Sequence, residues 1–436
     1  MMKSWIVVAS AWALLLGGCA SDGPAKLEAY GGPGNSEVFG GVLRGVSDQP
    51  TSPRVRYVFH IHGMGLTEQA PFRARLVDQV QSHGYQVLER GPWLPAMLPT
   101  AFRVSGPDLD CTSSWTDHLN PGAGSVEHPC DFPSFGEYSI DRMRAGDGRE
   151  VRIVTYYWHR DLWRIQEPYL RKDMLRPRAK WTGALKDNVI SGGLSDAAVY
   201  VGTSRPLVRA GISSALCAMA LNADGRKPIS PNDRSLTTCT VKGGLFGPAD
   251  AEFNFVTHSL GSRMLFDVLA PSDNAAEFAQ TRRRDTARGY LVIGTRSVFM
   301  AANQMPLLGA TMVDVRPMAT GAEAAPAPEP CRSAISLIAA RCAVAAEGAA
   351  ANAPNLQIVA FSDPDDLLGY RASDAGEQRP GLTFLEVTHR NTPVWFGRFV
   401  LPQEAHDKEL QRKSTAAMIL CGAVAGRDGG LTPRSC

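Results

Sequence analysis

One serine lies where an apolar run that predicts a strand meets a run that predicts a helix. The strand is expected over 253–257 and the helix over 260–269, and the junction reads Thr257-His258-Ser259-Leu260-Gly261. A serine on a sharp strand-to-helix turn projects its hydroxyl above the sheet, where it can act as a nucleophile. Gly261 is the small residue that such a turn needs two positions after the serine, whereas Thr257 is larger than the usual glycine two positions before it. The pattern predicts a nucleophilic Ser259, and the simpler interpretation is a serine that caps a helix.

A nucleophilic serine needs a base within hydrogen-bond reach, and that base needs a carboxylate to orient it. Three aspartates follow a predicted strand over 356–361, and all are candidates for the carboxylate: Asp363, Asp365 and Asp366. Asp363 is nearest to the strand end, while Asp366 directly precedes an aliphatic pair of leucines. The spacing leaves the choice open, and the two aspartates that do not orient the base could cap the following turn.

Two histidines are candidates for the base. His389 ends a predicted strand over 383–388, and His406 precedes a predicted amphipathic helix over 408–424. His406 is the favoured base because a residue on a loop can swing toward Ser259, and His389 is the alternative.

The elements that must position these residues alternate between strand and helix. Apolar runs predict further strands over 55–61, 151–158 and 298–302, and an amphipathic pattern predicts a helix over 206–220. Such alternation predicts the α/β class, with a mostly parallel sheet that helices cover on both faces. Residues 92–148 show no clear period and are predicted to be irregular.

The composition is that of a globular chain with a substantial core. The 436 residues are 44% hydrophobic and 20% charged, and the formal net charge is only +2. This balance argues against a nucleic-acid partner, a disordered chain and a multi-span membrane protein. We expect one large domain over 51–436.

The N-terminus resembles a bacterial lipoprotein signal. A basic start is followed by an apolar run over 5–16, too short to span a bilayer comfortably, and then by Leu16-Gly17-Gly18-Cys19. The resemblance implies a signal peptide over 1–18, lipid on Cys19 and a flexible tether over 19–50. Ser21, the second residue after that cysteine, points to the outer membrane, facing the periplasm. The alternatives are an ordinary secretory signal or an uncleaved anchor.

Eight cysteines remain when Cys19 is set aside. They fall in sequential pairs that bracket loop-like stretches: Cys111 and Cys130, Cys217 and Cys239, Cys331 and Cys342, Cys421 and Cys436. Local loops of this kind are readily closed by disulfides in an oxidising compartment, although the sequence does not determine the connectivity. A zinc site is not favoured, because the chain contains no C-x-x-C pair.

Taken together, the strand–serine–helix junction, the aspartate-rich loop and the late histidine resemble an α/β-hydrolase serine hydrolase of the lipase and esterase type. The similarity covers residues 55–425 in element order. In that superfamily the nucleophile, the acid and the histidine follow one another in this chain order. The loop around Asp366 is similar to lipase acid loops in which the aspartate precedes an aliphatic pair, so the resemblance favours Asp366 over Asp363.

The same resemblance implies where the oxyanion would bind. His62-Gly63-Met64-Gly65 follows an early predicted strand and is similar to the oxyanion loop of lipases. Backbone N–H groups of Met64 or Gly65, together with that of Leu260, would stabilise the tetrahedral oxyanion. His62 itself has a simpler interpretation, as a structural histidine that supports this loop.

The resemblance implies a hydrolase of carboxylic esters with a small-molecule or lipid substrate and no cofactor or metal. Ser259 would attack the acyl carbon, His406 would act as base and then acid, and Asp366 would orient the imidazole. The long segment 159–250 would contribute a cap over the site. Nothing in the sequence indicates the oligomeric state.

Two other functions stay open at this stage. One is a metal-dependent, amidohydrolase-like hydrolase, because several possible ligands lie near predicted strand ends: His60, His62, His159, His258, His389 and Asp363. The other is a surface lipoprotein that uses a hydrolase scaffold without catalysis, since a fold does not determine a function.

Overall fold

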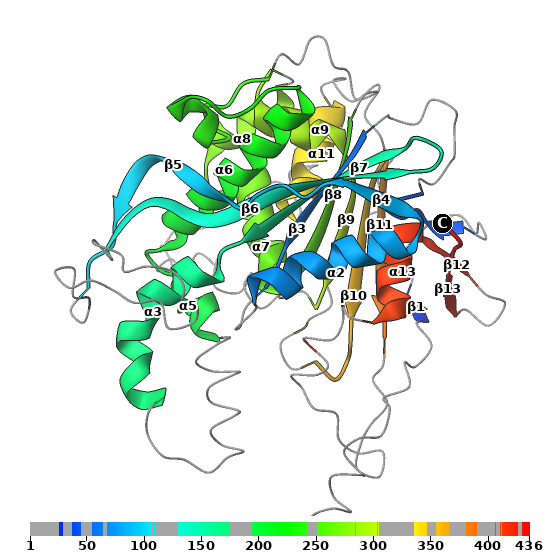
Figure 1. Cartoon of the computed structure of the whole chain (residues 1–436), viewed down its shortest axis with the longest axis horizontal. Helices are drawn as coiled ribbons and strands as arrows, with labels where there is room; N and C mark the ends of the chain where they lie inside the picture. The colour runs from blue at the N-terminus through cyan, green and yellow to red at the C-terminus, as the bar shows by residue number, and fades with distance from the viewer. Residues whose placement is uncertain are drawn as a thin grey trace, which may run out of the picture.

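The computed structural model describes residues 26–28, 37–44, 55–63, 68–106, 109, 130–174, 194–241, 251–283, 285–302, 304, 335–346, 355–366, 369, 381–389, 406, 410, 412–425 and 430–436. These residues are built around a central twisted sheet with helices on its two faces (Figure 1).

The strands of the central sheet are β1 Lys26–Glu28, β3 Val55–Ile61, β4 Tyr85–Glu89, β5 Leu94–Arg103, β6 Asp131–Ala145, β7 Glu150–Tyr157, β8 Ala251–His258, β9 Thr295–Ala301, β10 Leu356–Ser362 and β11 Leu382–Thr388. Their order is β1-β11-β10-β9-β8-β3-β7-β6-β4, with β5 paired to β6. The run from β11 to β7 is parallel, and antiparallel strands flank it on both sides. The predicted α/β class with a mostly parallel sheet is confirmed.

The helices are α2 Gln69–Ser82, α3 His159–Met174, α5 Ser195–Val201, α6 Arg205–Ala223, α7 Leu260–Leu269, α8 Ala275–Ala279, α9 Ala287–Gly294, α11 Ser336–Ala346 and α13 Lys413–Cys421, with 3-10 turns η2 Pro231–Arg234 and η3 Gln280–Arg282. One core cluster packs α6, α7, α9 and α11 on one face of the sheet. A second cluster packs α2 and α13 on the other face, across the front of the sheet in Figure 1. Helices therefore cover both faces, as predicted.

Strand β3 illustrates why the central strands are mostly apolar. Tyr57, Phe59 and Ile61 belong to the cluster with α6 and α7, while Val58 belongs to the cluster with α2. Because successive side chains point to opposite faces and both faces are covered, a central parallel strand must be apolar at nearly every position. Arg56 and His60 are the exceptions: Arg56 pairs with Glu252 of β8, and the His60 ring stacks on Phe72 of α2 with the centroids 4.1 Å apart.

Helix α6 is the one described helix that is long and apolar enough to cross a membrane by length and composition. About 72% of its most apolar window is buried inside the protein. Its side chains lie in the larger core cluster, which explains the apolar character without a bilayer. This placement also shortens the part of 159–250 that could form the predicted cap, because α6 lies within that range and belongs to the core of the domain.

The prediction that residues 92–148 are irregular is wrong for the described part of that range. Strands β5 and β6 lie there, and β6 pairs antiparallel with β4, β5 and β7. Strand β6 contains Pro133, Gly136 and several charged residues. Buried and partly exposed positions follow one another without a fixed period along its 15 residues. A strand of this kind has no continuous apolar run by which the sequence could reveal it.

The prediction of a simple tether over 19–50 is also corrected. β1 pairs antiparallel with β11, and a further strand, β2 (Glu37–Phe39), pairs with β12 (Ala423–Ala425). Phe39, Val42 and Leu43 are each 1% exposed and belong to the core cluster with α2. These strands are only three residues long, so their hydrogen-bonding partners, and not a hydrophobic period, determine them.

Disulfides join two of the sequential cysteine pairs. Cys217 in α6 is bonded to Cys239, and Cys421 at the end of α13 is bonded to Cys436. The second bond closes a small sheet of order β13-β12-β2, in which β13 is Leu431–Pro433. Two further cysteines, Cys130 and Cys342, are also disulfide-bonded, while Cys19, Cys111 and Cys331 lie outside the described residues.

Candidate active site

Ser259 occupies the sharp turn between β8 and α7. Its backbone dihedrals are φ 53° and ψ −127°, a region that residues with a Cβ rarely adopt. Strain of this kind persists only where the surrounding structure enforces it, and it is concentrated at functional sites. The N–H of Ser259 donates to the carbonyl of Ala301 in β9 at 2.8 Å, which holds the turn against the neighbouring strand. The strand–turn–helix setting predicted for this serine is present.

Two glycines allow the loop after β3 to approach this turn. A Cβ on Gly63 would lie 2.3 Å from the Cβ of Ser259, and a Cβ on Gly261 would lie 2.6 Å from the carbonyl oxygen of His62. Both distances are shorter than any real contact, so larger residues would force the two segments apart. The small residue predicted after the serine thus has a direct steric reason.

Thr257 fits where a glycine is usual. It is fully buried, and its hydroxyl is 2.7 Å from the hydroxyl of Ser262 and 3.3 Å from the carbonyl of Phe299. Its polar atom is therefore satisfied inside the core, which removes the main cost of burying it.

His406 lies against the serine. The Nε2 atom of His406 is 2.8 Å from Oγ of Ser259, and its Nδ1 atom is 2.8 Å from Oδ2 of Asp366. A carboxylate can only accept, so Nδ1–H donates to Asp366, and Nε2 of the neutral ring then accepts from the serine hydroxyl. The His406 and Asp366 side chains are only 5% and 1% exposed. The structure brings together the three residues that the sequence favoured as nucleophile, base and acid.

The other two aspartates of the loop have different surroundings. Asp363 is buried, pairs with Arg412 at 3.0 Å and accepts the N–H of Asp365 at 2.9 Å. Asp365 itself is exposed. The N–H of Asp366 donates to the carbonyl of Asp363 at 3.0 Å, so Asp363 shapes the turn that aims Asp366 at the base. The expectation that a second aspartate caps this turn agrees with the contacts of Asp363.

His389, the alternative base, faces a different partner. Its Nδ1 atom is 3.0 Å from the hydroxyl of Thr415 in α13, and its N–H donates to the carbonyl of Ser362. It therefore joins the ends of β10 and β11 to the helix beneath them. The ring of His406, in contrast, is bonded to both Ser259 and Asp366, so the geometry favours His406 as the base.

The candidate oxyanion donors are only partly described. Leu260 is fully buried and begins α7 directly after the serine, so its N–H lies at a helix N-terminus. Met64 and Gly65 lie outside the described residues. Gly63, directly before them, is the residue whose Cα lies against Ser259.

His62 supports the loop, as its simpler interpretation proposed. Its Nδ1–H donates to the carbonyl of Gly63 at 2.8 Å, and its Nε2 accepts the N–H of Trp158 at 3.3 Å. Its ring stacks on the Trp158 ring, with centroids 4.8 Å apart and an interplanar angle of 6°. Burial, and after it the nearby His159, hold the pKa of His62 well below its usual value, so the ring stays neutral.

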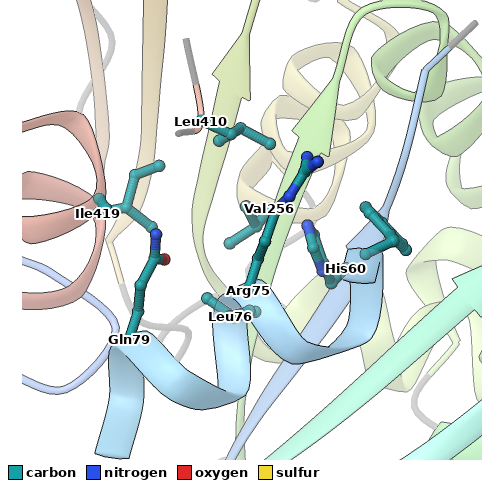
Figure 2. Close-up of a pocket in the computed structure, with 9 residues that line it drawn as sticks. His60, Arg75, Leu76, Gln79, Val256, Leu410 and Ile419 are labelled. Carbon is teal, nitrogen blue, oxygen red and sulfur yellow. The ribbon is translucent and has the colours of Figure 1, made fainter. Parts of the chain in front are cut away.

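A pocket lies on the α2 side of the sheet and not at the three-residue site. Figure 2 shows its lining, which consists of His60, Phe72, Arg75, Leu76, Gln79, Val256, Leu410, Ala416 and Ile419. Burial lowers the pKa of His60 to about 3, and the charge of Arg75 adds to this effect. The pocket contains none of Ser259, His406 or Asp366, so we do not regard it as the substrate site.

The metal-hydrolase alternative gains no support from the described residues. The one described group of ligating side chains that could share an ion is His83, Cys421 and Cys436, and its two cysteines are joined in a disulfide. None of the histidines that the alternative invoked belongs to that group.

Two residues of the site have roles that the sequence did not indicate. Arg412 fixes Asp363 through a buried ion pair. His258, which the sequence placed in the junction and among the possible metal ligands, contacts His406. Neither stands in a recognisable motif with its partner, since each contact spans a long stretch of chain. Comparison of the chain with known family models, curated proteins and solved structures finds no match.

Proposed function

We propose that this protein is a serine hydrolase that cleaves carboxylic esters through an acyl-enzyme intermediate. The observation that carries the proposal is the line of hydrogen bonds from Ser259 through His406 to Asp366, with the serine on a strained turn. A nucleophile, a base and an orienting carboxylate in this geometry constitute a catalytic triad, which is recognised by geometry and roles.

Each side chain then has a defined part in the reaction. Nε2 of His406 takes the proton of the Ser259 hydroxyl as Oγ attacks the acyl carbon, and Asp366 stabilises the imidazolium that forms. The N–H of Leu260, with a donor from the loop after Gly63, stabilises the tetrahedral oxyanion. His406 returns the proton to the leaving alcohol, and a water activated by the same histidine releases the acid. The second donor to the oxyanion, from the loop after Gly63, is the backbone N–H of Met64 or Gly65.

The arrangement of the strands supports an α/β-hydrolase fold. The serine follows β8 in the middle of the parallel run, the acid follows β10, and the base follows β11 in sequence. Nucleophile, acid and histidine in this chain order, with a serine on a strand-to-helix turn, are typical of that superfamily. Helices α3 and α5 pack against one another, and α5 also contacts α6. We assign α3 and α5, at the lower left of Figure 1, to the part of 159–250 that forms a cap.

We further propose that the enzyme is anchored in the bacterial envelope through lipid on Cys19, at the outer membrane facing the periplasm. The disulfides of the described domain agree with an oxidising compartment. A Cys19→Ser variant should move from the membrane fraction to the soluble fraction, and unchanged fractionation would contradict the anchor.

The catalytic proposal is tested with a fluorophosphonate probe and a panel of nitrophenyl esters of graded chain length. The wild-type protein should be labelled and should hydrolyse at least some of the esters. A folded Ser259→Ala variant should lose labelling and about a millionfold in turnover, as expected when the nucleophile of a triad is removed. If the wild-type protein is neither labelled nor active, the scaffold serves binding without catalysis; if Ser259→Ala keeps wild-type activity, the nucleophile is wrong.

A further inference from the structure

His258, the residue directly before the serine, contacts the main chain of the base. Its Nε2 atom is 2.9 Å from the main-chain carbonyl oxygen of His406, and the two rings have centroids 5.2 Å apart. A carbonyl oxygen can only accept, so Nε2–H of His258 is the donor. The bond therefore joins the strand that carries the nucleophile to the segment that carries the base.

The donor is attached to a rigid part of the fold. His258 is the last residue of β8 and lies in parallel register with Ala301 of β9. The next N–H along the chain, that of Ser259, donates to Ala301 at 2.8 Å. Because β8 is paired on one side with β9 and on the other with β3, the end of the strand has little freedom to move.

The contacts of His406 divide into two kinds. Ser259 and Asp366 bond to its ring, at 2.8 Å each, whereas His258 bonds to its backbone. Ring contacts alone allow the base to tilt about the line between them, since they fix two atoms of one side chain. A third contact on the main chain removes this freedom, and consecutive residues then fix both the nucleophile and the base.

We propose that His258 is a positioning residue, whose Nε2–H holds the backbone of His406 so that its ring meets Ser259 in reactive geometry. This inference rests on the proposed serine-hydrolase function. Misplacing a reacting group by about 1 Å can cost on the order of a hundredfold in rate, so the contact matters for turnover more than for substrate affinity.

The test compares three variants of His258 in the full-length protein by ester turnover. His258→Phe keeps the ring size but has no donor, and kcat should fall about tenfold to a hundredfold with KM changed less than about twofold. His258→Gln carries an amide N–H at nearly the same reach as Nε2 and should restore most of the lost kcat. His258→Asn is a matched control, because its shorter amide does not reach the carbonyl; it should behave like the Phe variant.

The outcomes separate this proposal from the proposed function. If Ser259→Ala is inactive but His258→Phe and His258→Asn have wild-type kcat, the positioning role is wrong and the triad stands. If Gln and Asn lower kcat equally, donor reach does not matter, and the proposal is again overturned. If Ser259→Ala is fully active, the failure lies in the proposed function. If His258→Phe does not fold, the kcat values of His258→Gln and His258→Asn still decide whether the positioning role is right.

Discussion

The same strands bury polar side chains at both ends, but the two ends differ in how these groups are satisfied. At the N-terminal end, Glu252 of β8 accepts from Arg56 of β3 at 3.1 Å and from Arg296 of β9. At the C-terminal end, β8 leads to Ser259, which is hydrogen-bonded to His406. The N-terminal end therefore carries ion pairs between neighbouring strands, whereas the C-terminal end carries a line of hydrogen bonds that ends in a hydroxyl.

The two ends also differ in whether they hold a group that can transfer a proton. Both carboxylate oxygens of Glu252 are engaged by guanidinium groups that cannot lose their protons. Arg56 also donates to the carbonyls of Val42 and Leu43, so that its charge is held by the backbone as well. At the opposite end an imidazole stands between the hydroxyl and the carboxylate, and an imidazole can take up and return a proton near neutral pH. Strand ends can therefore bury similar polarity and still serve stability in one place and, under the proposed function, reaction in the other.

After the Ser259→Ala loss, the largest effect is expected at the C-terminal end from Asp366→Asn. An amide in place of the carboxylate no longer holds His406 in the tautomer whose Nε2 accepts from Ser259, and kcat should fall about ten-thousandfold. Steady-state turnover of a nitrophenyl ester measures this loss, with circular dichroism to show that the variant is folded.

Asp365→Asn is the matched control in the same loop. Its side chain is exposed, so its turnover should stay within about twofold of the wild-type value. A large loss in this variant together with an active Asp366→Asn variant would show that the acid has been assigned wrongly.

The next effect is expected at the N-terminal end, and on stability instead of rate. Glu252→Gln removes the negative charge with which both Arg56 and Arg296 pair. Breaking a buried ion pair leaves the remaining charge uncompensated. The free energy of unfolding should fall by about 3 kcal/mol in urea titrations. The kcat of the folded variant should match that of the wild-type protein.

An exposed ion pair calibrates that loss. Arg283 and Asp285 are 64% and 62% exposed, so Asp285→Asn should cost less than about 1 kcal/mol. Equal losses in the two variants would mean that burial does not distinguish the Glu252 cluster.

The last effect appears only in acid and concerns His60, near the C-terminal end of β3. Its pKa is about 3 in the folded protein, against an ordinary value of 6.5. The unfolded chain binds the proton first, so this histidine leaves stability unchanged above pH 6.5 and lowers it as the pH falls from 6.5 toward 3, by about 1.4 kcal/mol per pH unit. His60→Phe should remove this part of the pH dependence. Unfolding titrations of the wild-type protein and of His60→Phe at pH 7 and pH 5 measure how much free energy of unfolding each loses between the two pH values. Equal losses in the two proteins would refute the assignment.

Much of the fold could be predicted because its central strands are covered on both faces. β3, β8 and β10 are buried almost throughout and rich in apolar and aromatic side chains, so that an apolar stretch in the sequence indicates each of them. The antiparallel strands β5 and β6 and the short β1 and β2 could not be found in this way. Their backbone hydrogen bonds depend on a partner elsewhere in the chain, and their side chains are only partly buried.

The sequence by itself determined the position of the proposed nucleophile, because a strand, a tight turn and a helix are adjacent in the chain and act within a few residues of Ser259. Only the tertiary structure decided which aspartate and which histidine join it. His406 is separated from Asp366 by 40 residues and from Ser259 by 147. The choice of Asp366 over Asp363 depends on Arg412, which occupies the Asp363 carboxylate, and the choice of His406 over His389 depends on Thr415. Contacts of this range arise from the packing of the sheet against α13, and no local pattern encodes them.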